Sequence, residues 1–164
     1  MTIPNKVRLI CILRHRDPHI HNNDATIIVA NKIMEGFIQD SDKVALMSSG
    51  PNRATMTIKV FEELLDTKNH VYSILFSEDY YDVRGGRPEI AINAIAEVAS
   101  KEDADIVIIV THREWTEHLG RYIKIDRFGE SEKYQSEDSM LGYSIARIID
   151  LRNPETEDIL ITPY

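Results

Sequence analysis

Near the N-terminus, an apolar run reads Val7-Arg8-Leu9-Ile10-Cys11-Ile12-Leu13 and leads directly into Arg14-His15-Arg16-Asp17. The run has one charge and predicts a buried β-strand. In open α/β folds, ligands bind at the edge formed by the carboxyl ends of the strands. Arginine offers a planar fork of donors to an anion, and a neutral imidazole can be a nucleophile. The stretch therefore predicts an anion site, with phosphate as the expected anion; two solvated charges at a strand end are the alternative.

Strand-like apolar runs alternate with helical patterns along the rest of the chain. Apolar residues recur at helical spacing after Asp24, which we expect to be an N-cap, and again after Pro51, Pro88 and Trp115. Further strands are predicted at residues 44–47, 71–76, 106–110, 143–151 and, as an antiparallel edge, 159–161. The polar residues 124–142 predict a long loop close to the ligand site. This alternation predicts an α/β fold, a three-layer α/β/α sandwich with a mostly parallel central sheet.

Length and charge limit what the protein can be. Its 164 residues suit one domain over residues 1–164, and the formal net charge of −8 argues against a large nucleic-acid-binding face. No apolar run approaches the roughly 20 residues of a membrane helix, and no signal peptide is evident. Cys11 is the single cysteine, which excludes an internal disulfide and suits a reducing compartment. We therefore predict a cytoplasmic protein that binds neither nucleic acid nor membranes, with its oligomeric state left open.

Three predicted strand ends carry residues suited to an anion. The first ends in Arg14 and His15, the second leads into a helix with Arg53 in its first turn, and the strand at 106–110 ends near His112. Because the carboxyl ends of parallel strands meet at one edge of a sheet, these residues can converge although about a hundred positions separate them. A phosphate there would contact two guanidinium groups and the N–H groups of a helix N-terminus.

The same three pieces carry a resemblance to a known family. They are Leu13-Arg14-His15, Ser48-Ser49-Gly50-Pro51-Asn52-Arg53-Ala54-Thr55-Met56-Thr57, and Thr111-His112. In this order and context, the chain from residue 7 to residue 151 resembles the histidine phosphatase superfamily, the phosphoglycerate mutase-like group with an Arg-His-Gly signature.

The resemblance implies a phosphatase that acts on a phosphorylated small molecule or a phosphoprotein. His15 would take the phosphoryl group as a phosphohistidine, Arg14 and Arg53 would bind the phosphate oxygens, and His112 would complete the pocket. Glu78 is our choice of proton donor to the leaving group, with Asp79 and Asp82 in the same loop as alternatives. The resemblance implies no cofactor and no metal, and a phosphatase is expected rather than a mutase.

Two features leave other hypotheses open. Arg16 stands where the family has glycine, so it either binds a more highly charged substrate or obstructs the pocket and leaves a weak or inactive phosphate-binding domain. The sequence His15-x-Asp17-x-His19-x-His21 instead suggests a metal-dependent phosphoesterase. That class needs further ligands from later strand ends, where only His112 is well placed. We therefore expect a metal-independent enzyme.

Overall fold

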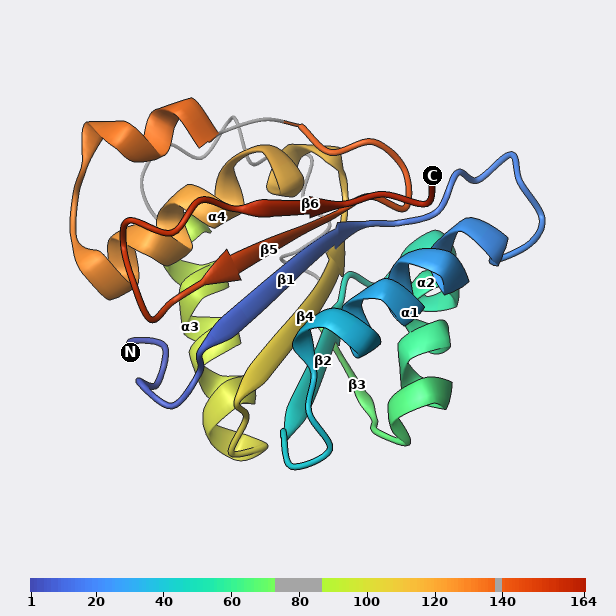
Figure 1. The fold of residues 1–164 in the computed structure, drawn as a ribbon, viewed down its shortest axis with the longest axis horizontal. Coiled ribbons are helices and arrows are strands. Elements are labelled where there is room, and N and C mark those ends of the chain that lie inside the picture. Colours follow the sequence, from blue (N-terminus) through green and yellow to red (C-terminus); the bar gives the residue numbers. More distant parts are fainter. Residues whose placement is uncertain (73–86, 138–139) are drawn as a thin grey trace.

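Six strands form one sheet with helices on both faces in the computed structural model, which describes residues 1–72, 87–137 and 140–164 (Figure 1). The strands are β1 (Leu9–Arg14), β2 (Val44–Ser48), β3 (Asn69–Val71), β4 (Ile106–Thr111), β5 (Ala146–Asp150) and β6 (Ile159–Ile161). The helices are α1 (Asp24–Phe37), α2 (Asn52–Leu65), α3 (Arg87–Lys101) and α4 (Arg113–Phe128), followed by the short 3-10 helix η3 (Glu132–Glu137).

The strand order is β3-β2-β4-β1-β5-β6. Strands β3, β2, β4 and β1 pair in parallel, whereas β5 pairs antiparallel with both β1 and β6. Leu13 of β1 and Ser48 of β2 both pair with Val110 of β4, so the three strands end at the same level. The predicted layered α/β fold with a mostly parallel sheet is confirmed, and so is the antiparallel edge strand.

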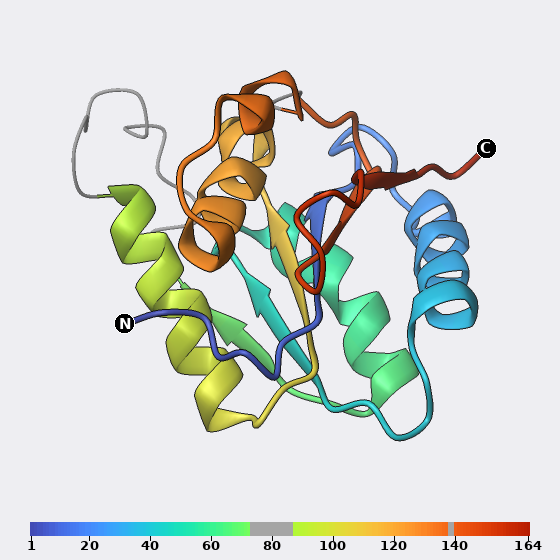
Figure 2. The same cartoon turned by 60° about the vertical axis from the view of Figure 1, so that its left-hand side comes forward.

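Alternate residues of each central strand pack under different helices. Cys11 and Leu13 of β1 belong to a core with α1 and α2, and Ile10 and Ile12 belong to a second core with α3 and α4. Figure 2 shows the two helix pairs on opposite faces of the sheet. Strands buried on both faces read as continuous apolar runs, which is why the sequence predicted them well.

Several element boundaries differ from the predictions. Asp24 is the first residue of α1, and Asn23 is the N-cap. The predicted loop at 124–142 is wrong at its start, because α4 continues to Phe128 and η3 follows. Lys124 lies on the buried face of that helix, and the polar sequence around it gave no sign of this burial. Strand β3 begins at Asn69, and residues 73–76 of the predicted strand lie outside the described residues.

Cys11 is a buried free thiol in the middle of β1. Burial raises the pKa of this thiol to about 12, so it packs as a small apolar side chain and not as a reactive thiolate. In the described ranges, no helix combines the length and apolarity needed to cross a membrane. A cytoplasmic location stays a prediction.

Candidate active site

The site lies where β1, β2 and β4 end together. His15 follows β1, Ser49 follows β2, and His112 follows β4 and caps the N-terminus of α4. The rings of His15 and His112 have centroids 4.9 Å apart, and both side chains are almost fully buried. The strand-end argument therefore placed two distant histidines together correctly.

The imidazole of His15 is held in one orientation by its own backbone. Its Nδ1 lies 2.7 Å from the carbonyl oxygen of Arg16. A carbonyl can only accept, so Nδ1 carries the proton and, in the neutral ring, Nε2 keeps its lone pair. Burial lowers the pKa of His15 from 6.5, the Arg16 carbonyl raises it, and the charges of Arg53 and Arg14 lower it again. The net lowering favours the neutral ring with Nε2 unprotonated.

His112 is held by the end of the neighbouring strand. Its Nε2 lies 2.7 Å from the hydroxyl of Ser49, and the Ser49 N–H donates to the carbonyl of Val110. Burial, followed by the charges of His15, Arg53 and Arg14, lowers the pKa of His112 to about 3. His112 is therefore neutral at neutral pH and contributes a hydrogen-bonding group, not a charge.

Two arginines supply the positive charge of the site. The Arg14 guanidinium stacks over the Tyr143 ring at 4.0 Å from its centroid and donates to the carbonyl of Leu141 at 3.1 Å. Arg53 is half-buried in the first turn of α2, and it makes no side-chain hydrogen bond or ion pair with any part of the chain that the structure describes. A half-buried guanidinium without a counter-charge, close enough to lower two histidine pKa values, favours binding of an anion.

Thr57 links the two arms of the site. Its buried hydroxyl accepts the backbone N–H of Arg16 at 2.9 Å and donates to the carbonyl of Arg53 at 2.7 Å. The loop that carries His15 is thereby attached to the helix that carries Arg53. Residue-level reasoning assigned Thr57 no role; its spacing of four residues from Arg53 on a helix was the available signal.

Tyr143 and Ser144 close the site from the segment before β5. Ser144 has a φ of 56°, and its N–H lies 3.2 Å from the carbonyl of Arg14 and 3.3 Å from that of His15. Its hydroxyl lies 3.1 Å from that of Thr26 on α1. The prediction of a strand from residue 143 is therefore wrong at its beginning, because this left-handed turn replaces the first residues of the strand and places Tyr143 beside His15.

Solved structures share this fold over nearly the whole chain. A mycobacterial glucosyl-3-phosphoglycerate phosphatase in complex with VO3 is 12% identical, with 87% of this chain and 90% of that chain covered and a TM-score of 0.58. The alpha-ribazole phosphatase from Shigella flexneri is 10% identical, with 94% of each chain covered and a TM-score of 0.57. A phosphoglycerate mutase from Plasmodium falciparum is 14% identical, with 93% of this chain and 87% of that chain covered and a TM-score of 0.57.

All three proteins are members of one superfamily. The chain has the fold of the histidine phosphatase superfamily. No protein-family model and no curated protein matches the sequence. Identities of this size show a common fold and leave the activity to be argued from the site.

Arg16, which by the sequence resemblance stands where the histidine phosphatase superfamily has glycine, has no backbone strain. The non-glycine residues with positive φ in the described part of the chain are Asp66, Asp103 and Ser144, so Arg16 does not need glycine's conformational freedom. Its guanidinium donates to Asn23 Oδ1 at 3.0 Å and lies 3.5 Å from Met56 Sδ. The side chain thus extends toward the start of α1 and α2.

Two other predictions concern the proton donor and the alternative metal site. Glu78, together with Asp79 and Asp82, lies outside the described residues. His19 and His21 are exposed, and Asp17 accepts the backbone N–H of His19 at 2.9 Å. Within the described ranges, no three histidine, cysteine or carboxylate side chains are grouped as a metal site would require.

Proposed function

We propose that this chain is a metal-independent phosphatase that hydrolyses a phosphomonoester or a phosphoprotein through a phosphohistidine on His15. The observation that carries the proposal is the state of His15: the Arg16 carbonyl fixes the proton on Nδ1, and burial with two nearby guanidinium groups favours the neutral ring. A neutral imidazole with one free nitrogen is a competent nucleophile. The known activities of proteins with this fold, which include phosphatases, support the same reading.

The first step transfers the phosphoryl group to the enzyme. Nε2 of His15 forms the P–N bond while the bond from phosphorus to the leaving oxygen breaks, and that oxygen takes a proton. The guanidinium groups of Arg14 and Arg53 would stabilise the charge on the phosphoryl oxygens, which is the main requirement of phosphoryl transfer. Glu78 remains the proposed proton donor, on the resemblance alone.

The second step releases the product. A water oxygen forms a new P–O bond while the P–N bond breaks, which gives inorganic phosphate and returns His15 to its neutral form. His112 is neutral and hydrogen-bonded to Ser49, so it would contribute a hydrogen-bond donor to the phosphoryl oxygens and add no charge to the site.

Comparing wild type with His15→Ala tests the proposal directly. We expect hydrolysis of p-nitrophenyl phosphate to fall by on the order of 10³-fold or more, since the nucleophile is lost. Brief incubation with radioactively labelled phosphomonoester should label wild type with a bond that survives base and breaks in acid, as a phosphohistidine does. His70→Ala, a histidine paired with Glu102 away from the site, is the matched control.

Two results would count against the proposal. Equal hydrolysis by wild type and His15→Ala would remove His15 from the nucleophile's role. Tight phosphate binding without turnover or labelling would favour the alternative, a domain that binds phosphate and does not hydrolyse its esters.

A further inference from the structure

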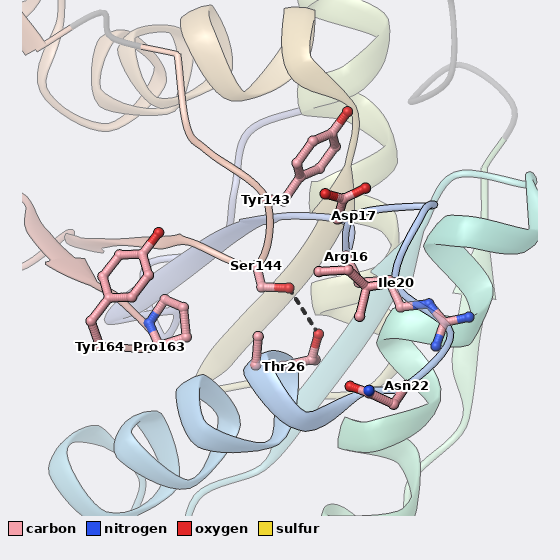
Figure 3. A pocket seen from close by; sticks show the side chains of 10 residues that line it. Arg16, Asp17, Ile20, Asn22, Thr26, Tyr143, Ser144, Pro163 and Tyr164 are labelled. Atoms are coloured by element: carbon pink, nitrogen blue, oxygen red, sulfur yellow. Dashed lines mark hydrogen bonds between the residues drawn. The ribbon is translucent and has the colours of Figure 1, made fainter.

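A cavity of about 260 Å³ lies beside the phosphoryl-transfer site (Figure 3). Its walls come from the loop after β1, the start of α1, the turn before β5 and the C-terminal segment. Six of the residues that line it are Arg16, Ile20, Tyr143, Ser144, Pro163 and Tyr164. Most of these present apolar or aromatic surface, and Arg16 adds a positive charge. The cavity therefore suits a mainly apolar organic group, and its lining includes one cation, Arg16, and one carboxylate, Asp17.

The cavity adjoins His15 but is separate from the phosphate-binding groups. The ring of Tyr143 lines the cavity and has its centroid 5.5 Å from that of His15. Arg16 is the next residue after His15 and also lines the cavity. Among the described residues, Arg14, Arg53 and His112 do not line it. The cavity thus lies beside His15 and outside the set of phosphate-binding groups.

The charge of Arg16 has no carboxylate partner in the described part of the chain. Its contacts are the neutral Asn23 amide oxygen and the Met56 sulfur. Asp17 also lines the cavity, but Figure 3 shows its carboxylate beneath Tyr143 and the Arg16 guanidinium on the side of Asn22. An uncompensated guanidinium at the wall of a largely apolar cavity attracts an anionic group more strongly than it would in open water.

We propose that this cavity binds the leaving group of the substrate, and that Arg16 selects leaving groups with a second anionic group such as a carboxylate. The inference rests on the proposed phosphatase function and names its substrate class. It also explains why an arginine can replace the signature glycine. Its side chain lines the neighbouring cavity and ends against Asn23 and Met56, while its backbone carbonyl still holds His15.

Two aryl phosphates of equal size and shape test the inference. 4-Carboxyphenyl phosphate carries the second anion, and 4-carbamoylphenyl phosphate replaces it with a neutral amide. We define the preference as the ratio of kcat/KM for the first compound to that for the second. The preference in wild type should exceed that in Arg16→Gln by about fivefold, the coupling of a partly exposed charge pair. Arg16→Lys should retain part of it, and about 1 M salt should reduce it because screening shortens to about 3 Å.

Arg152→Gln is the matched control. Arg152 is paired with Asp150 outside the cavity, so its loss should leave the preference unchanged. The same preference in wild type and Arg16→Gln, with both compounds hydrolysed, would overturn the cavity assignment and leave the phosphatase function intact. If neither compound is hydrolysed, the phosphatase function fails. The cavity assignment is then tested by binding: calorimetry gives the dissociation constants of both compounds for wild type and Arg16→Gln. An equal preference for the carboxylate compound in the two proteins would overturn it.

Discussion

Two buried or half-buried cations in this protein have opposite surroundings. Lys124 of α4 is buried with its ammonium 2.7 Å from the carboxylate of Asp158, and Arg147 of β5 lies 3.8 Å from the same carboxylate. Arg53 of α2 makes no ion pair with the described residues. Burying a charge is costly unless it is paired, so the chain supplies the counter-charge where the cation is structural. Where it supplies none, a ligand can do so.

The largest effect is expected at Arg53, a cation without a carboxylate partner among the described residues. Replacing it with alanine should lower kcat/KM for a phosphomonoester by on the order of 10³-fold, or about 4 kcal/mol, because the developing charge on the phosphoryl oxygens loses a fork of donors. Arg53→Lys should fall between the two, since it keeps the charge and loses the fork. Steady-state kinetics measures the effect. Unchanged kinetics in Arg53→Ala would show that the unpaired cation has no part in the reaction.

The cluster of Lys124, Arg147 and Asp158 should affect stability and not activity. Asp158→Asn leaves Lys124 and Arg147 without their shared carboxylate, so we expect the free energy of unfolding to fall by about 3 kcal/mol. Urea denaturation measures this. The control is Asp150→Asn, which breaks the exposed pair with Arg152 and should cost less than about 1 kcal/mol. Equal losses in the two variants would show that burial adds nothing to the pairing.

Acid should destabilise the folded protein through His112. Its pKa is about 3 in the folded protein and ordinarily 6.5, so the unfolded chain binds more protons between these values. Stability conferred by neutral His112 is thus present above pH 6.5 and is lost as the pH falls toward 3. Between pH 7 and pH 5, wild type should lose about 2 kcal/mol more than His112→Asn. Urea denaturation at both pH values checks this, and equal losses would contradict it.

Residues in the same site differ in how far the sequence could predict them. Strands buried on both faces gave continuous apolar runs, and the rule for strand ends then brought His15, Arg53 and His112 together. The roles of Thr57 and Ser144 depend on backbone groups of other segments, which no local pattern encodes. Lys124 was assigned to a loop because its partner, Asp158, is distant in sequence. The tertiary contact between the two side chains stabilises the buried ammonium of Lys124.

Tyr143 provides the smallest test of the comparison, because its ring is the neutral neighbour of a site cation. Its aromatic face lies 4.0 Å from the Arg14 guanidinium, and such contacts contribute about 0.5–1 kcal/mol at partly exposed positions. Tyr143→Leu should therefore lower kcat/KM by about fivefold at most, with little change in the free energy of unfolding. Tyr143→Phe keeps the ring and should retain most of the activity. If Tyr143→Phe loses as much activity as Tyr143→Leu, the effect belongs to the hydroxyl. If Tyr143→Leu has wild-type kinetics, Arg14 keeps its position through the Leu141 carbonyl and its other contacts.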